Sequence, residues 1–220
     1  MPENVMFLSL IKRVFWQISS KRLDANEKLP FLPNYIRFQV RGHAQAWRIF
    51  THMTKQELLA LYRLVLNLSS GSIIVEIGSY LGASTCFLAA GASELGGKVY
   101  CVDTWQNEGM TEGSRDTFSI FYRNTTKYRN FIKPLRGKSI QIAESFSEKI
   151  DLLFIDGDHS YEGTKSDVES WLPHLKSGGL VIMHDSGWAE GVKRVINENI
   201  EPMIQKKGEL PNMYWAWLNN

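Results

Sequence analysis

One segment constrains the fold of this 220-residue chain more than any other: an apolar run that leads directly into a glycine-containing turn. Residues 73–77, Ile-Ile-Val-Glu-Ile, have the length and the β-branched character of a buried strand. Gly78 and Gly82 follow, and Ser84 and Thr85 can then open a helix. Because glycine lets the backbone approach another group closely, this pattern predicts a binding turn between a strand and a helix.

From Gly71 onward, predicted strands and helices alternate, which is typical of a parallel sheet covered by helices. Strands are expected at 73–77, 99–102, 131–135, 152–155, 180–183 and 214–218, and helices at 84–95, 140–146, 162–175 and 190–200. Residues 106–127 are too polar for the core and are predicted as an excursion. We expect an α/β fold: a Rossmann-like, doubly wound, mostly parallel sheet with helices on both faces.

Residues 1–70 lack the alternation of strands and helices seen in the rest of the chain, and they are predicted to form an N-terminal helical accessory or lid segment. Residues 71–220 are predicted to form one globular unit. An amphipathic helix over residues 5–18 has three alternative partners: the domain, which is the default, a second subunit, or a membrane surface. Pro30, Pro33 and the aromatic-rich run at residues 31–38 indicate an irregular connector. Thr54 to Glu57 fits a capping box for the helix that follows.

The composition of the chain narrows the classes of partner and the compartment that we expect for it. A formal net charge of +2, from 25 basic and 23 acidic residues, provides no general field for nucleic acid. Cys86 and Cys101, the two cysteines, both lie in apolar segments, which argues against a disulfide framework and favours a reducing cytoplasm. No apolar run has the length of a membrane span, and the N-terminus lacks the pattern of a signal peptide.

Trp215 and Trp217 have strand spacing and would pack on the sheet or in a homodimer interface.

A second acidic residue follows at the distance expected for a ribose-binding side chain. Asp103 ends the strand at 99–102, just over twenty residues after the glycine turn. The glycines follow the pattern Glu-x-Gly-x-x-x-Gly, which differs from the Gly-x-Gly-x-x-Gly of dinucleotide sites. The ligand is therefore expected to lack a pyrophosphate.

On these residues, Glu76 to Ser84 and Asp103, the chain resembles the class I S-adenosylmethionine (SAM) dependent methyltransferases, most closely the small-molecule O-methyltransferases. The resemblance covers about residues 70–187 and implies that the glycine turn faces the methionine part of SAM, that Asp103 binds ribose and that Ser139 binds adenine. The implied SAM-binding residues are Glu76, Gly78, Ser79, Gly82, Ser84, Asp103, Ser139 and Asp156. The alternatives are that the glycines only allow packing and that Ser139 only caps a helix.

Acidic side chains and histidines gather after the next two predicted strands. Asp156, Asp158 and His159 follow the strand at 152–155, and His184 and Asp185 follow the neighbouring one. Because oxygen ligands from adjacent strands suit a hard ion, we predict a divalent metal, Mg²⁺ first, on Asp156, His184 and Asp185. The histidine is a softer ligand than a carboxylate, so Mn²⁺, a transition metal or no metal stay open.

Two residues are candidates for the catalytic base. The resemblance to antibiotic-sugar O-methyltransferases points to Asp158, and the resemblance to catechol-type enzymes points to His159, where those enzymes have a lysine. The unperturbed pKa of histidine suits proton transfer near neutrality. The alternative for Asp158, as for Ser160, is a cap on the helix that begins near Glu162.

We therefore expect a cytoplasmic SAM-dependent methyltransferase that acts on a hydroxyl oxygen of a small molecule, a sugar or another hydroxylated metabolite, with assistance from a divalent metal. Nucleic acid is not expected as a partner, and the N-terminal helix leaves room for peripheral membrane contact. The alternatives are a metal-independent or N-methylating enzyme, a metal-dependent hydrolase built on Asp156, Asp158, His159 and Asp185, and a non-catalytic SAM-binding protein.

Overall fold

The computed structural model describes residues 32–107 and 113–219. The helix predicted over residues 5–18 lies outside them. The described residues up to Gln45 form one compact unit, and those from Ala46 onward form a second. The helix predicted after Thr54 thus belongs to the same unit as the sheet. The assignment of residues 1–70 to an accessory or lid segment stays a prediction.

The first unit contains a helix where the sequence indicated an irregular connector. Helix α3 spans Leu32–Val40. Pro33 lies in its first turn, where backbone N–H groups have no intrahelical acceptor, so the missing N–H of proline costs nothing. The connector prediction is therefore wrong over these residues. A 3-10 helix, η1 (Ala44–Arg48), follows.

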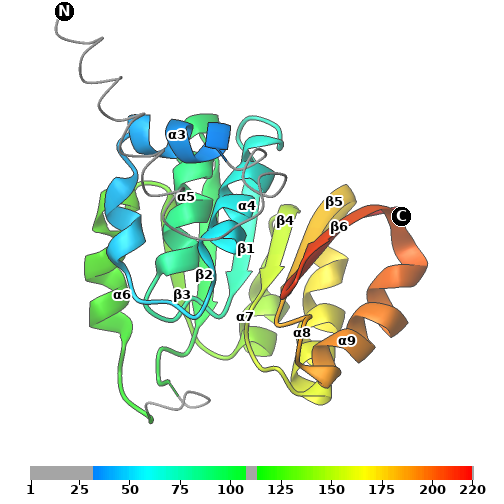
Figure 1. The fold of residues 1–220 in the computed structure, drawn as a ribbon. Coiled ribbons are helices and arrows are strands. Elements are labelled where there is room, and N and C mark those ends of the chain that lie inside the picture. The colour runs from blue at the N-terminus through cyan, green and yellow to red at the C-terminus, as the bar shows by residue number, and fades with distance from the viewer. Residues whose placement is uncertain (1–31, 108–112, 220) are drawn as a thin grey trace, which may run out of the picture. The chain divides into compact units, whose positions relative to one another are not determined.

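The second unit contains a seven-stranded sheet in the order β3-β2-β1-β4-β5-β7-β6 (Figure 1). Its strands are β1 (Ile73–Ile77), β2 (Lys98–Asp103), β3 (Ile132–Arg136), β4 (Ile150–Ile155), β5 (Leu175–His184), β6 (Ile204–Leu210) and β7 (Met213–Leu218). The first five run parallel, whereas β7 is antiparallel to both β5 and β6. This confirms the predicted Rossmann-like, mostly parallel fold and adds β6, which was not predicted.

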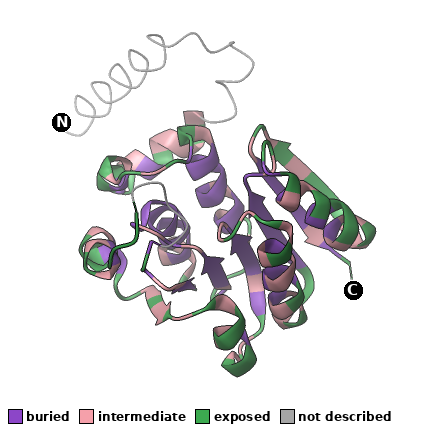
Figure 2. Ribbon diagram, turned by 90° about the horizontal axis from the view of Figure 1, so that it is seen from below, coloured by how far each residue is buried: buried purple, intermediate pink, exposed green. Residues whose placement is uncertain are grey.

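Helices cover both faces of the sheet. They are α4 (Lys55–Leu66), α5 (Ala83–Leu95), α6 (Phe118–Thr125), α7 (Ser139–Ser145), α8 (Tyr161–Trp171) and α9 (Glu190–Val195), with short turns η2 (Thr126–Tyr128), η3 (Leu172–His174), η4 (Ile196–Ile200) and η5 (Glu201–Met203). Val75 and Val102 pack with α7, α8 and α9 in one apolar cluster. Successive strand residues face opposite sides, so Ile74 and Cys101 lie towards the other face, where α4 and α5 pack together. Figure 2 shows the buried residues along the strands and the inner sides of these helices.

The described part of the segment at 106–127 is more buried than its polarity suggested. It contains α6, and Phe121, Thr117 and Thr125 are buried. Trp105 and Phe121 pack with ring centroids 4.7 Å apart, which gives the helix an apolar anchor. The expectation that this excursion stays out of the core is wrong for these residues.

Two smaller expectations agree with the structure. Both cysteines are buried and free. Helix α4 has the predicted capping box, in which the Thr54 side chain accepts from the Glu57 N–H and the Glu57 carboxylate accepts from the Thr54 N–H at 2.7 Å. No helix in the described part of the chain is long and apolar enough to cross a membrane.

Candidate functional site

Most of the predicted site residues lie at or just beyond the carboxyl ends of strands β1, β2, β4 and β5. Ser84 lies in the first turn of α5, and Ser139 begins α7. Parallel neighbours end at the same edge of a sheet, so their terminal side chains converge. Backbone hydrogen bonds join these ends: the Asp156 N–H donates to the Ile77 carbonyl at 2.8 Å, and the Gly78 N–H donates to the Val102 carbonyl at 2.9 Å.

The glycine turn needs its glycines for packing. Gly78 has a φ of 83°, and a Cβ there would lie 2.0 Å from the Asp156 carbonyl oxygen. Gly82 has a φ of 87°, and its Cβ would lie 2.6 Å from Cγ2 of Thr125. Left-handed backbone and close contact both exclude a side chain at these positions. The turn is thus packed directly against the end of β4, where the second group of site residues begins.

Glu76 is a buried carboxylate beneath this turn. The Ser79 hydroxyl donates to Oε2 at 2.8 Å, and the Thr85 hydroxyl donates to the same oxygen. Burial raises the pKa of Glu76 to about 7, against the opposing effect of the Ser84, Thr85 and Ser79 hydroxyls. Its Oε1 is buried without a hydrogen-bond partner among the described residues.

Asp103, the last residue of β2, hydrogen-bonds the backbone of the glycine turn. Its Oδ2 accepts from the N–H groups of Ser79 and Tyr80, both at 2.8 Å, and its Oδ1 accepts from the Trp105 N–H at 2.6 Å. Tyr80 and Trp105 have positive φ values, 45° and 51°, which these bonds help to hold. A carboxylate has about four acceptor positions, so one, on Oδ1, is left for a ligand.

Ser139 is the first residue of α7 and does not cap it, because the N-cap is Lys138. The Ser139 hydroxyl instead accepts from the Trp171 indole N–H at 2.7 Å. It also hydrogen-bonds Asp167, whose pKa burial raises to about 6. Ser139 is therefore held by two residues of α8.

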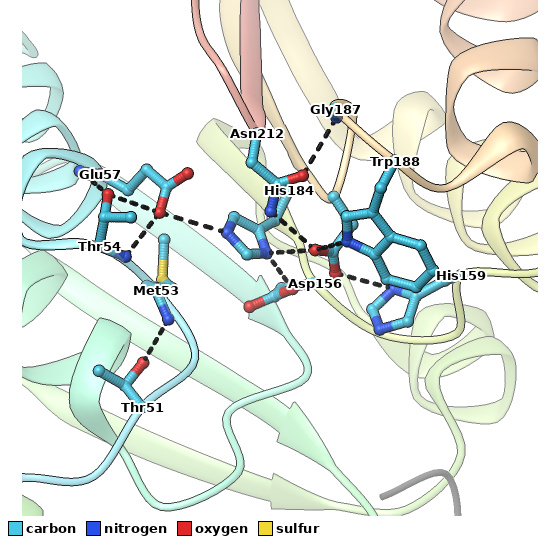
Figure 3. A network of polar contacts seen from close by, with 11 residues as sticks. Thr51, Met53, Thr54, Glu57, Asp156, His159, His184, Gly187, Trp188 and Asn212 are labelled. Atoms are coloured by element: carbon cyan, nitrogen blue, oxygen red, sulfur yellow. Dashed lines mark hydrogen bonds and ion pairs between the residues drawn. The ribbon is translucent and has the colours of Figure 1, made fainter.

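The three residues predicted as metal ligands lie together beyond β4 and at the end of β5 (Figure 3). Asp156, His184 and Asp185 each offer one ligand atom, and these atoms all lie within 4.8 Å of one another. Nδ1 of His184 is 3.0 Å from Oδ1 of Asp156 and 3.3 Å from Oδ1 of Asp185. His184 and Asp185 are buried, and Asp156 is partly exposed.

Glu57, which the sequence indicated only as half of a capping box, faces this cluster from α4. Its Oε2 lies 3.7 Å from Nε2 of His184, an ion-pair distance that is too long for a hydrogen bond. Burial alone would lower the pKa of His184, but the carboxylates of Asp156, Asp185 and Glu57 outweigh it and raise this pKa to about 12. The three carboxylates that face its ring nitrogens therefore favour the protonated form of His184.

Asp185 is held on both oxygens. Its Oδ1 accepts from the Trp188 indole N–H at 2.7 Å and from the Asn212 amide at 2.9 Å, and its Oδ2 lies 3.1 Å from Nδ1 of His159. Although burial opposes it, His184 and these donors keep the pKa of Asp185 well below its usual range. Trp188 and Asn212 were not predicted, and Asn212 comes from the turn between β6 and β7.

The two candidate bases have different surroundings. The Asp158 carboxylate accepts from the Ser160 N–H at 2.8 Å and lies against Gly163 in the first turn of α8. Ser160 caps that helix by accepting from the Gly163 N–H at 3.1 Å. Asp158 thus stabilises the start of α8, which agrees with the alternative role that the sequence left open for it. His159 faces Asp185, and its side chain is 39% exposed.

Comparison with known proteins places this arrangement in a family. The family model described as "Methyltransferase domain" matches residues 75–186, which span the glycine turn, Asp103, Asp156, His184 and Asp185. The chain therefore belongs to this family of methyltransferase domains.

One curated relative, "Uncharacterized protein y4gI" of Sinorhizobium fredii, is 32% identical over 117 residues, which are 51% of this chain and 13% of that protein. The chain therefore spans only a small part of the length of this relative.

Three solved structures show the same fold. An O-methyltransferase from Bacillus cereus in complex with SAH has a TM-score of 0.63 at 18% identity, over 94% of this chain and 97% of that one. The O-methyltransferase TomG from Streptomyces achromogenes, in complex with SAM, has a TM-score of 0.61 at 14% identity, over 81% and 88%. CalS11, a TDP-rhamnose 3′-O-methyltransferase of calicheamicin biosynthesis, has a TM-score of 0.55 at 16% identity, over 100% and 96%.

Proposed function

We propose that the chain transfers the methyl group of SAM to a hydroxyl oxygen of a small molecule, with assistance from a divalent metal. One observation carries this proposal: the glycine turn is packed on the backbone of Asp156, the first residue of the cluster. A methyl donor on the turn and an acceptor oxygen at the cluster would be neighbours. Methyl transfer depends on such in-line placement more than on covalent help from the protein.

The donor side has free positions that fit SAM. Oε1 of Glu76, buried and without a partner, would accept from the ammonium of the methionine moiety. The free position on Oδ1 of Asp103 would accept from a ribose hydroxyl. The proposed binding set stays that of the sequence analysis, with Gly78, Ser79, Gly82 and Ser84 forming the turn, Ser139 at the adenine and Asp156 beside the methyl group.

The cluster also fits a divalent ion. Two carboxylates and one imidazole nitrogen are a usual ligand set, and their atoms already converge. Nδ1 of His184 would have to lose its proton, so metal and proton would compete for it. A bound ion would lower the pKa of an acceptor hydroxyl and orient its oxygen.

His159 is the better placed of the two candidate bases. Asp185 orients its ring through Nδ1, which leaves Nε2 to take the hydroxyl proton, and the side chain is partly open to solvent. Asp158 is occupied at the start of α8. We therefore propose His159 as the base, oriented by Asp185, and Asp158 as a residue that stabilises the start of α8.

The structural neighbours support the acceptor class, since the B. cereus protein, TomG and CalS11 are O-methyltransferases and CalS11 is a TDP-rhamnose 3′-O-methyltransferase.

A metal-independent enzyme is a second candidate. His184 faces three carboxylates that favour its protonated form, and that form would balance part of their charge without a metal ion.

Release of SAH from SAM, measured on a panel of hydroxylated sugars and aromatic diols, tests the proposal. We expect turnover that EDTA abolishes and Mg²⁺ or Mn²⁺ restores. Turnover that survives EDTA would overturn the role of the metal and favour the second candidate. His159→Ala should lower kcat by about 10²-fold or more, whereas Asp158→Asn should change it less.

A further inference from the structure

Trp188 is a large aromatic side chain that the structure leaves 61% exposed beside the cluster. The other large hydrophobic residues exposed in the described part of the chain are Val40, Phe50, Tyr122 and Ile140. Trp188 differs from them because it is bonded to the carboxylate of a site residue, Asp185. A single exposed tryptophan is common on protein surfaces, so exposure alone would not mark Trp188. Its hydrogen bond to Asp185 and its contact with the His159 ring place an apolar ring face with a polar edge at the candidate site, a combination that suits a ligand.

The ring is held in place by several contacts. Its indole N–H donates to Oδ1 of Asp185 at 2.7 Å, and its backbone N–H donates to the Asp185 carbonyl at 3.3 Å. The preceding Gly187 donates to Oδ1 of Asn212 at 3.1 Å, and a Cβ there would lie 2.1 Å from the Pro211 carbonyl. The ring is therefore preorganised, which reduces the entropy that binding a partner would cost.

The imidazole of His159 packs against this ring. The centroids of the two rings are 5.5 Å apart and their planes meet at 69° (Figure 3). A molecule stacked on the indole would thus meet the imidazole and the Asp185 carboxylate at its edge. The proposed base would then be within reach of a hydroxyl carried on the edge of that molecule.

We propose that Trp188 is the binding platform for the acceptor, and that the acceptor is a pyranose. This inference rests on the proposed function. A pyranose has an apolar face of C–H groups that packs on an aromatic ring, and hydroxyl groups around its edge that donate to carboxylates and imidazole. The exposed face of Trp188 together with Asp185 and His159 at its edge offers both kinds of contact.

Saturation-transfer NMR on the full-length protein in the presence of SAH tests the platform. The probes are methyl α-D-glucopyranoside, methyl α-L-rhamnopyranoside, glycerol and catechol. We expect the two pyranosides to receive saturation on ring C–H protons, and glycerol, which has no such face, to receive none. In Trp188→Ala, pyranoside affinity should fall roughly tenfold or more, corresponding to about 1.4 kcal/mol or more.

Two further variants make the outcome decisive. Trp188→Phe keeps an aromatic face and should keep most of the affinity, even if Trp188→Ala is poorly folded. Tyr122→Ala removes an equally exposed aromatic ring from α6 and should bind pyranosides like the wild type. Equal pyranoside binding by wild type and Trp188→Ala, or no pyranoside binding by the wild type, would overturn the inference. Saturation of catechol alone would overturn the pyranose assignment.

SAM affinity, measured by calorimetry on the same proteins, separates the two proposals. We expect wild type, Trp188→Phe and Tyr122→Ala to bind SAM equally. Failure of the wild type to bind SAM would contradict the proposed function itself, whereas SAM binding without pyranoside binding contradicts only the platform.

Discussion

His184 is the residue on which the cluster depends. It is buried, and both of its ring nitrogens face carboxylates that come from α4, from the end of β4 and from Asp185 beside it. A buried imidazolium is stable only while these charges compensate it, and removing one of them leaves an uncompensated charge.

Glu57→Gln tests this dependence. Glutamine still offers an oxygen to the N–H of Thr54 but carries no charge, so the pKa of His184 should fall, and the free energy of unfolding at pH 7 should drop by about 2 kcal/mol or more. NMR titration of His184 and urea unfolding would measure the two effects. Thr54→Ala, which disrupts the cap but keeps the charge, should cost about 1 kcal/mol and leave the pKa of His184 unchanged. Equal His184 pKa values in wild type and Glu57→Gln would contradict the ion pair.

The raised pKa of Glu76 should make the free energy of unfolding depend on pH. Its pKa is about 7 in the folded protein against 4.5 for the free side chain, so between these pH values the folded state keeps a proton that the unfolded state has lost. Stability relative to the neutral variant Glu76→Gln should therefore decrease as pH rises from about 4.5 to 7, by on the order of 3 kcal/mol. Urea unfolding of both proteins across this range measures the difference. A difference that is constant with pH would show that the pKa of Glu76 is normal.

At the scale of residues, the sequence allowed prediction of Asp156, His184 and Asp185 as neighbours because each follows a strand of one parallel sheet. Glu57 and Trp188 were missed as site residues. Glu57 reaches the cluster only because α4 packs on the same unit as the sheet, a tertiary contact that no local pattern encodes. Trp188 had a signal, an aromatic residue three positions after Asp185, but its exposure is visible only in the fold.

At the scale of elements, the junction between the glycine turn and β4 is the most constrained contact. Gly78→Ala would put a Cβ 2.0 Å from the Asp156 carbonyl oxygen, in addition to its positive φ. We expect this variant to lose about 3 kcal/mol or more of stability and to lose SAM binding.

Gly71→Ala is the matched control for that variant. It has a similar φ, 75°, but nothing within 4 Å of the added Cβ, so it should cost only about 1 kcal/mol from backbone strain. Urea unfolding compares the two. Equal losses of stability would contradict the close packing of the turn on β4.

Elements with a periodic apolar face could be predicted from the sequence, and those held by tertiary contact could not. The helix at 55–66 and strands β1, β2 and β4 have clear patterns and were predicted within a few residues. Strand β6, Ile-Gln-Lys-Lys-Gly-Glu-Leu, lies at the sheet edge and is mostly polar, as exposed edge strands often are. Its pairing with β7 stabilises it, and its sequence alone gives no strand signal.

At the scale of the whole molecule, alternation of strands and helices was sufficient to predict the architecture, since a parallel sheet needs helical crossovers on its faces. Helix α4 precedes the change in composition near residue 70 but lies in the same unit as the sheet, a tertiary relationship that composition does not encode. The chemical class of the methyl acceptor is the hardest property to predict from the sequence, because a shared fold does not determine it. We infer that it depends on side chains beside the common fold, such as Trp188.

The central claim, that the glycine turn and Asp103 form a SAM site, is tested most directly by titrating the full-length protein with SAM in a calorimeter, for the wild type and for Asp103→Asn. Asp116→Asn, which neutralises an exposed carboxylate paired with Arg136, is the matched control. We predict saturable one-site binding by the wild type and the control, and binding at least roughly tenfold weaker in Asp103→Asn. Absence of SAM binding by the folded wild type, or equal affinity in all three proteins, would contradict the account.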